Sequence, residues 1–345
     1  MKRHRIFISI ILLFFFVKTF GEERELKVLQ FNIWQEGTMV ENGFFGIVRT
    51  IVLLEPDLIT FSEVRNYDGV DFIARLLSEL KTEGLSYYGE SGIDAGIISK
   101  YPIERQEVVF PLNDDHGTVL KAIIKICGKS VTLYSAHLDY TRYACYLPRG
   151  YDGNTWRKMD APVLNVESIL KMNRESQRDE AVVAIIEDAV NERNRGNIVI
   201  LGGDFNEPSH LDWIEETKYL YGHNGAIVPW DCSILLTKFG FKDSYREMFP
   251  DPVTHPGFTF PSDNKGVPVG KLTWAPNADE RERIDFVYFI PHKCLHLKDA
   301  FIVGSRCSIV KGKREKESCE DHFLFYGCPW PSDHKGVMIL FTLSM

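Results

Sequence analysis

Short apolar segments of strand length recur along the chain and set its expected architecture. Residues 26–33, 57–64, 198–201, 284–289 and 337–341 are apolar runs of the kind found in buried strands. Further short strands are predicted at residues 95–99, 107–110 and 301–303. These segments are therefore expected to supply the hydrophobic core.

Three stretches between the apolar runs have the spacing of helices. Residues 40–54 form the first, which must end before Pro56 because proline cannot continue a helix. The second covers residues 71–80, where apolar residues recur every four positions. The third covers residues 174–193, and Gly196 is placed to end it.

A β-hairpin is predicted near the middle of the chain. Residues 121–127 and 131–136 are apolar or alternate around Gly128 and Lys129, a two-residue turn that suits type II′. Antiparallel pairing at this point excludes a purely parallel sheet. Since helices are interspersed and no linker or repeat divides the chain, we expect one large α/β domain with more than one sheet layer.

The first residues have the layout of a secretory signal peptide. Lys2, Arg3 and Arg5 precede an apolar run at residues 6–17, which is short for a membrane span, and cleavage is expected after Gly21. An uncleaved N-terminal anchor is the alternative. The predicted division is a signal peptide at residues 1–21 and one domain at residues 22–345. We expect a secreted or periplasmic protein with no stable membrane span after cleavage.

The charge balance bears on the substrate. Loss of residues 1–21 removes four cations and no acids, so the formal net charge changes from −8 to −12. An acidic protein does not attract polyanions through its overall field, so a nucleic-acid substrate would need a local basic strip. The charge therefore weakens a nuclease interpretation without excluding it.

Seven cysteines follow the predicted signal peptide. In an oxidising compartment some should pair, and the group between Cys294 and Cys328 is the expected place for a bridge. A zinc site is the rival interpretation. It is disfavoured because the chain has no CxxC pair.

Several apolar strands end in polar residues, which is where ligands collect in layered α/β folds. Taken singly, each residue could be a cap, a turn, a surface acid or a core histidine. Asp285, inside a strong strand, should be costly unless paired, and His334 is the expected partner. The set comprises Asn32, Glu63, His137, Asp204, Asn206, Asp285, Asp333 and His334.

Three motifs in this set carry a resemblance to a known family. Residues 203–206 read Gly-Asp-Phe-Asn, residues 283–285 read Arg-Ile-Asp, and residues 332–334 read Ser-Asp-His. In this order the chain resembles the endonuclease/exonuclease/phosphatase superfamily over residues 26–343. The resemblance implies the deoxyribonuclease I-like α/β (α+β) fold, a four-layer sandwich of two mixed β-sheets flanked by helices.

The resemblance also implies roles for the residues. Glu63, helped by Asn32, would hold Mg²⁺ or Mn²⁺, and Asp333 would contribute to this ion or to a second one. Asp204 would orient or deprotonate the attacking water, and Asn206 would hold a phosphate oxygen. His334 paired with Asp285, together with His137, would act on the phosphoryl group or the leaving group.

One departure from the family pattern concerns the metal. Some members carry an acid two residues after the asparagine, but this chain has Trp34 there, and Glu36 is the nearest acid. A second metal site is therefore in doubt, and Trp34 is predicted to shape the pocket instead.

Residues 139–158, directly after His137, form a long aromatic and basic segment. We expect it to line a substrate pocket, with residues 264–282 beside it; the alternative is a packed structural loop held through Cys145. The basic run at residues 311–316 is interpreted as a solvated loop that could also contact phosphates. The predicted substrate-binding residues are Trp34, Tyr140, Arg142, Tyr143, Trp156 and Trp274.

Together these observations predict a secreted, Mg²⁺- or Mn²⁺-dependent phosphoric ester hydrolase. The preferred substrate is a small or lipid-like phosphate mono- or diester, and its P–O bond would be cleaved by in-line water attack. The alternative is a secreted nuclease acting on DNA or RNA, with aromatic rings stacked on bases. An inactive binding protein of the same fold is less favoured, because Glu63, Asp204, Asp285 and His334 are all present.

Overall fold

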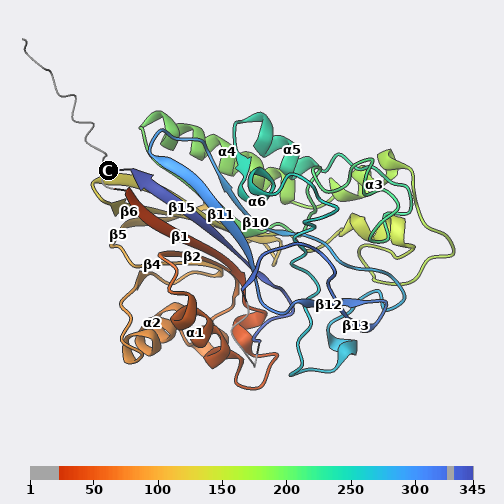
Figure 1. The fold of residues 1–345 in the computed structure, drawn as a ribbon, viewed down its shortest axis with the longest axis horizontal. Helices are drawn as coiled ribbons and strands as arrows, with labels where there is room; N and C mark the ends of the chain where they lie inside the picture. Colours follow the sequence, from red (N-terminus) through yellow and green to blue (C-terminus); the bar gives the residue numbers. More distant parts are fainter. Residues whose placement is uncertain (1–22, 325–329, 345) are drawn as a thin grey trace, which may run out of the picture.

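The computed structural model describes residues 23–324 and 330–344. The predicted signal peptide at residues 1–21 lies outside the described residues, as does Cys328. In the described part, two large mixed β-sheets pack against each other and helices cover their outer faces (Figure 1). This arrangement confirms the predicted four-layer α/β sandwich.

The first sheet has seven strands in the order β14-β11-β15-β1-β2-β4-β3. Its central strands β1 and β2 are parallel, whereas β15 and β4 run antiparallel to them. The strands are β1 Glu23–Asn32, β2 Leu58–Val64, β3 Tyr88–Gly89, β4 Asp94–Ser99, β11 Leu295–Val303, β14 Phe323–Leu324 and β15 Gly336–Ser344.

The second sheet has six strands in the order β5-β6-β7-β8-β10-β9, in which only β7 and β8 are parallel neighbours. A separate two-stranded sheet pairs β12 with β13. The strands are β5 Ile103–Phe110, β6 Gly117–Ile126, β7 Lys129–Leu138, β8 Ile198–Asp204, β9 Lys242–Asp243, β10 Asp285–Phe289, β12 Cys307–Val310 and β13 Lys313–Lys316.

Helices form the outer layers because each places an apolar face on a sheet. α1 and α2 pack on the seven-stranded sheet, and α4 and α5 pack on the six-stranded sheet. The α-helices are α1 Gly43–Leu54, α2 Phe72–Thr82, α3 Val166–Asn173, α4 Arg178–Asn194, α5 Asp231–Lys238 and α6 Ser244–Met248. The 3₁₀ helices are η1 Gln35–Gly37, η2 Tyr67–Gly69, η3 Ala144–Arg149 and η4 Val269–Lys271.

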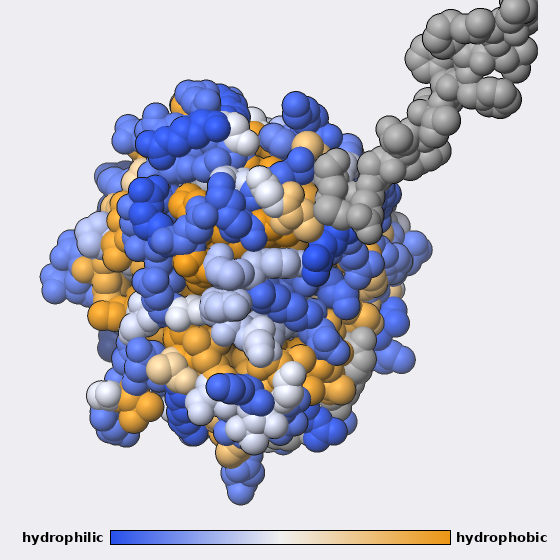
Figure 2. Space-filling model, turned by 90° about the vertical axis from the view of Figure 1, so that its left-hand side faces the viewer, coloured by the Kyte–Doolittle hydropathy of each residue, from blue (hydrophilic) through white to orange (hydrophobic). Residues whose placement is uncertain are grey.

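The apolar runs meet between the two sheets. Val28 and Leu58 of the first sheet belong to the same buried cluster as Leu133 and Ile200 of the second. Each such side chain, fully removed from water, stabilises the fold by ~1.5–3 kcal/mol. The surface is less uniform: Figure 2 shows hydrophobic and hydrophilic residues mixed on the face at the left of Figure 1.

Towards one end of the sandwich the contacts between the sheets become polar. The hydroxyl of Ser62 donates to the carbonyl of Ala136 at 3.1 Å, and the hydroxyl of Ser135 donates to the carbonyl of Phe61 at 3.1 Å. These bonds join the sheets close to where β1, β2, β7 and β8 end. They fix the two sheets relative to each other directly below the polar strand ends.

Three local predictions are corrected. In the hairpin, Ile126 pairs with Lys129, so Cys127 and Gly128 form the turn; with φ of 50° and 76° they suit type I′ rather than type II′. The helix predicted at residues 174–193 begins at Arg178, because a separate helix, α3, ends at Asn173. The basic run at residues 311–316 is not a loop but largely the exposed strand β13.

The described cysteines are all free. No disulfide joins any two of the six cysteines that the structure describes, so Cys294, Cys307 and Cys319 of the predicted bridge region are not bonded to one another. Among residues 23–324 and 330–344, no helix is both long and apolar enough to cross a membrane.

Candidate active site

Six strand ends place the predicted site residues at one edge of the sandwich. Asn32, Glu63, His137 and Asp204 lie at or near the C-terminal ends of β1, β2, β7 and β8. Asp285 begins β10. In the register of the six-stranded sheet, Asp204 is paired with Asp285 on one side and with His137 on the other. Asp333 and His334 immediately precede β15. The fold therefore gathers residues that are up to 302 positions apart in the chain.

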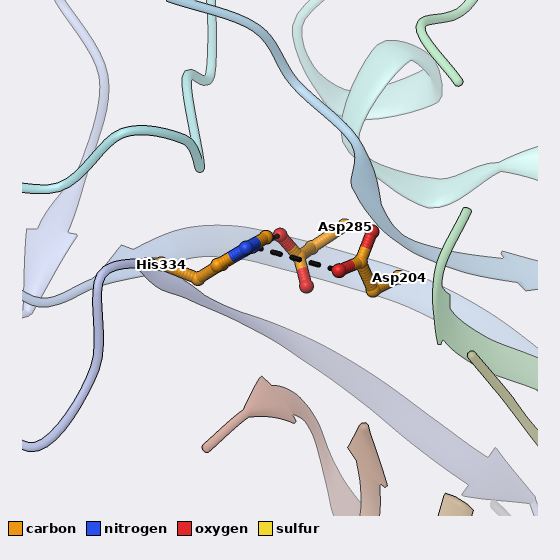
Figure 3. Close-up of side chains that lie close together, drawn as sticks. All are labelled: Asp204, Asp285 and His334. Atoms are coloured by element: carbon orange, nitrogen blue, oxygen red, sulfur yellow. Dashed lines mark hydrogen bonds and ion pairs between the residues drawn. The ribbon is translucent and has the colours of Figure 1, made fainter. Parts of the chain in front are cut away.

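The predicted pairing of His334 with Asp285 is present. Nδ1 of His334 lies 2.8 Å from Oδ2 of Asp285 (Figure 3). The other oxygen of Asp285 accepts from Nε2 of Gln30 at 3.3 Å. Burial opposes the charged imidazole, but the carboxylates of Asp285 and Asp204 raise the pKa of His334 to about 10. His334 is therefore a protonated donor at neutral pH.

His137 has a carboxylate partner that the sequence did not identify. Its Nδ1 lies 2.8 Å from Oδ1 of Asp94, the first residue of β4, and Arg65 Nη1 lies 3.1 Å from the same oxygen. Burial again opposes protonation, yet Asp94 and then Asp204 raise the pKa of His137 to about 9. An acid at the head of the apolar segment 95–99 was the available signal, but nothing in the sequence linked it to His137.

Asp204 occupies the centre of the site. Its Oδ2 accepts from Nδ2 of Asn32 at 2.8 Å, and its Oδ1 accepts from the backbone N–H of Asn206 at 2.9 Å. Burial, followed by the charge of Asp285, raises the pKa of Asp204 to about 6, against the opposing effect of His334 and then His137. A carboxylate with such a pKa can accept a proton near neutral pH.

Asn206 and Asn32 hold the neighbouring groups in place. Nδ2 of Asn206 donates to the carbonyl of Leu138 at 3.0 Å and lies 3.3 Å from Nε2 of His137. Asn32 uses the same amide nitrogen for Asp204 and for Oε1 of Glu63, at 3.1 Å from the latter. Its own oxygen accepts from the N–H of Trp34 at 2.9 Å, which leaves one lone pair for a cation.

The side chains of the site fit a hard divalent cation at Glu63 and Asp333. Oδ1 of Asp333 is buried without a hydrogen-bond partner among the described residues. Burial outweighs the opposing charge of His334 and, together with the nearby charge of Glu63, raises the pKa of Asp333 to about 7. Two carboxylates that repel each other in this way suit an oxygen-binding cation between them.

A second trio could also hold a metal on distance alone. Ligand atoms of Asp204, Asp285 and His334 all lie within 4.8 Å of one another. However, Nδ1 of His334 is already engaged by the carboxylate of Asp285, 2.8 Å away. Oδ1 of Asp333, in contrast, has no partner among the described residues, so Glu63 and Asp333 are the better ligands.

One cavity of about 320 Å³ contains this site and a group of aromatic rings. On one side it is lined by residues that we call the catalytic wall: Glu63, His137, Asp204, Asn206, Asp333 and His334. The other lining residues include the aromatic wall, which is defined as Tyr140, Tyr143, Tyr146, Trp156 and Trp274. The predicted pocket function of residues 139–158 is thus supported by their position.

Five of the six predicted substrate-binding residues line the cavity, including Trp34. Arg142 is not among the lining residues, and its Nη1 instead lies 3.5 Å from Glu175. Its backbone is left-handed (φ 54°) just before η3 begins, and the attraction of the Glu175 carboxylate holds the guanidinium there.

Glu280, which the sequence did not single out, holds the two halves of the aromatic wall together. Its Oε1 accepts from the hydroxyl of Tyr146 at 2.6 Å and from the N–H groups of Trp274 and Ala275 at 2.8 and 2.7 Å. The ring centroids of Trp156 and Trp274 are 5.6 Å apart. Cys145 is buried and free, so the segment is packed but no disulfide to another described cysteine holds it.

Three known proteins are similar to this chain over most of its length. An uncharacterized protein of Caenorhabditis elegans is 27% identical over 286 residues, which cover 80% of this chain and 83% of that protein. Truncated C. elegans TDP2 is 19% identical, with a TM-score of 0.51, over 92% of this chain and 97% of that one. The 3' phosphatase NExo from Neisseria, bound to product DNA hairpin, is 17% identical with a TM-score of 0.50, over 91% and 98% of the two chains.

These structural similarities establish the fold. The family is established by sequence, because the model of the Endonuclease/Exonuclease/phosphatase family matches residues 29–334, which include every residue of the catalytic wall. The chain therefore belongs to the endonuclease/exonuclease/phosphatase family.

Proposed function

We propose that this protein is a divalent-metal-dependent hydrolase of a small or lipid-like organic phosphate, either a monoester or a diester. The observation that carries the proposal is the shared cavity, in which the catalytic wall and the aromatic wall lie within one space of about 320 Å³. A phosphoryl group among the polar residues would leave its organic part in contact with aromatic rings. Among the described lining residues, only Arg65 is a lysine or arginine, and it is paired with Asp94 and Asp115.

Glu63 and Asp333, with the oxygen of Asn32, would hold Mg²⁺ or Mn²⁺. When bound, such an ion would neutralise charge on the phosphoryl oxygens. The charges of Glu63 and Asp333, which repel each other in its absence, would then be balanced.

The remaining residues of the catalytic wall account for in-line attack by water. Asp204 accepts a proton from the water molecule as the oxygen of that water bonds to phosphorus. Protonated His334 and the amide of Asn206 donate hydrogen bonds to phosphoryl oxygens. His137, also protonated, gives a proton to the departing ester oxygen as the P–O bond breaks, and Asp94 keeps this imidazole charged.

Nuclease activity is the second candidate. D. rerio TDP2 complexed with single strand DNA product is 16% identical to this chain, with a TM-score of 0.50, over 92% of this chain and 98% of that one. Aromatic rings can stack on bases, and the exposed Arg157 and Lys158 beside Trp156 could contact a backbone. The acidic net charge of −8 and the paired state of Arg65 favour the small substrate. We also propose that residues 1–21 direct export, so that the substrate is met outside the cytoplasm.

A substrate panel with and without chelator tests the proposal. Full-length protein with Mg²⁺ is given p-nitrophenyl phosphate, bis-p-nitrophenyl phosphate, plasmid DNA and a single-stranded oligonucleotide. We expect turnover of at least one small ester, loss of that turnover with EDTA, and its loss in Asp204→Ala and His334→Ala. Rapid plasmid nicking without turnover of small esters would instead establish the nuclease.

A further inference from the structure

The turn that follows β1 has an unusual backbone. Residues 34–37, which we call the left-handed turn, have four consecutive positive φ angles of 41°, 53°, 63° and 73°. Only the last of these residues is a glycine. For a residue with a Cβ atom this conformation is unfavourable, and it persists only where the surroundings impose it.

The N–H groups of the turn bind the two residues that would hold the cation. The N–H of Trp34 donates to Oδ1 of Asn32 at 2.9 Å, and the N–H of Gln35 donates to Oε2 of Glu63 at 2.8 Å. Glu63 itself has a positive φ of 70°. The orientation of both side chains therefore depends on the left-handed turn.

The side chain of Glu36 attaches this turn to the residues that directly follow β2. It is only 8% exposed, and its Oε1 accepts from the backbone N–H groups of Arg65 and Asn66 at 2.7 and 2.6 Å. Bonds from N–H groups to a carboxylate are about twice as strong as those to a neutral acceptor. Because Arg65 follows Glu63 by two residues, the Glu36 carboxylate also fixes the backbone next to Glu63.

The other end of the turn is fixed by close backbone packing. A Cβ added to Gly43 would lie 2.1 Å from the carbonyl oxygen of Gly37. The turn thus has a fixed end at Gly37, and Glu36 attaches it to the residues that follow β2. Glu36 is not among the residues that line the cavity, and its bonded oxygen faces backbone, so it is not itself a metal ligand.

We propose that Glu36 is a positioning residue that sets the affinity of the site for a divalent cation by fixing the Glu63 carboxylate. The inference rests on the proposed metal-dependent function. It also gives a role to the acid that stands nearest to Trp34, the position at which some family members carry a carboxylate.

Titration of full-length protein with Mn²⁺, with free Mn²⁺ followed by electron paramagnetic resonance, tests this. Glu36→Ala should raise the Kd for Mn²⁺ by about 10- to 100-fold, as loss of a residue that orients a ligand does. Glu36→Gln keeps an oxygen for the two N–H groups and should recover most of the affinity. Glu41→Ala, an equal charge change at an exposed position of the same loop, is the matched control and should bind as the wild type does.

The activity of Glu36→Ala should return towards the wild-type value as Mg²⁺ is raised, which a global folding defect would not allow. Wild-type Mn²⁺ affinity in folded Glu36→Ala overturns the inference. If that variant does not fold by circular dichroism, Glu36→Asp replaces it, since its shorter side chain cannot hold both N–H groups. Glu63→Ala separates the proposed metal site from the proposed role of Glu36. Unchanged Mn²⁺ binding in Glu63→Ala overturns the metal site itself. Loss of binding in Glu63→Ala with unchanged binding in Glu36→Ala overturns only the role of Glu36.

Discussion

The catalytic wall and the aromatic wall line one cavity but are held in place by different means. His137 and Asp204 belong to strands, and their backbones are register partners in the six-stranded sheet. Tyr146 lies in the short helix η3 and Trp274 in a loop, and neither belongs to a sheet. Their relative position depends on one buried carboxylate, that of Glu280.

The difference indicates a division of labour. Strand ends fixed by backbone ladders give reacting groups the small positional error that catalysis requires. Loops held by side-chain bonds can change without disturbing the sheets, so they are suited to determine which substrate enters. Substitutions in the two walls should therefore affect different kinetic constants.

The largest effect is expected in the catalytic wall. Asp204→Ala removes the group that accepts the proton of water, so kcat should fall by roughly 10⁴-fold. KM for a small ester should change little, because the aromatic wall is intact. Steady-state kinetics on the best substrate of the panel would measure both constants. A variant with kcat within a few-fold of the wild type would show that Asp204 is not the proton acceptor.

Asp94→Asn tests the role of Asp94, the carboxylate partner of His137, which does not itself belong to the catalytic wall. His137 has a pKa of about 9 beside Asp94, and without that charge the pKa should fall towards the ordinary value of 6.5. In the variant, burial still lowers the pKa of His137, and the charges of Asp204 and Glu63 still raise it. Arg65 keeps its ion pair with Asp115. We expect kcat to decrease about 100-fold at pH 8.

The pH profile shows whether this loss is a matter of protonation. In Asp94→Asn the alkaline limb of kcat/KM should move to lower pH, and activity should partly recover near pH 6, where His137 is again charged. A uniform loss at every pH would mean that Asp94 supports only the structure. His116, which lies beside Asp139 outside the catalytic wall, offers a control in His116→Gln.

The contrast between the walls also determines what the sequence could predict. Asp204, Asp285 and His334 end or begin strong apolar segments, so their strand positions and their pairing followed from pattern and charge. Asp94 also begins such a segment, but its partner is 43 residues away on the other sheet. Only the packing of the two sheets brings them together, and no local pattern encodes it.

Loop geometry was the least predictable part. The aromatic composition of residues 139–158 indicated a pocket, yet Arg142 points to Glu175 rather than lining the cavity. The hairpin turn shifted by one residue because the register of β6 and β7 places Lys129 in a strand. At both places a residue other than glycine, Arg142 or Cys127, has a positive φ, which composition does not reveal.

In the aromatic wall, Trp274→Ala should act on substrate binding. The side chain is 53% exposed and lies beside Trp156, so its removal should cost contact with the organic part of the substrate rather than the fold. We expect KM for an ester with a bulky organic group to rise about tenfold, with kcat nearly unchanged. Equal KM values for the wild type and the variant would exclude Trp274 from the substrate site.

The smallest effect concerns the support behind the aromatic wall. His223 is 2% exposed and stacks on Trp213 at a centroid distance of 3.7 Å. Burial, followed by the charge of Arg149, lowers the pKa of His223 to about 2. Arg149 ends η3, the helix that carries Tyr146, and binds Glu282. An acid-sensitive contact thus lies under the aromatic wall.

The sign of the pH effect follows from linkage. The unfolded chain binds a proton at His223 near pH 6.5 whereas the native protein does not, so this residue makes the fold less stable as the pH falls from about 6.5 towards 2. Between pH 7 and pH 6 the contribution should be a loss of about 0.7 kcal/mol in the free energy of unfolding. Urea unfolding of the wild type and of His223→Phe, which keeps a flat ring on Trp213, isolates it from the opposing titration of buried carboxylates. The wild type should lose more stability than the variant over this interval. An equal loss in both would mean that His223 takes up a proton in the native state and is not held neutral by its packing on Trp213.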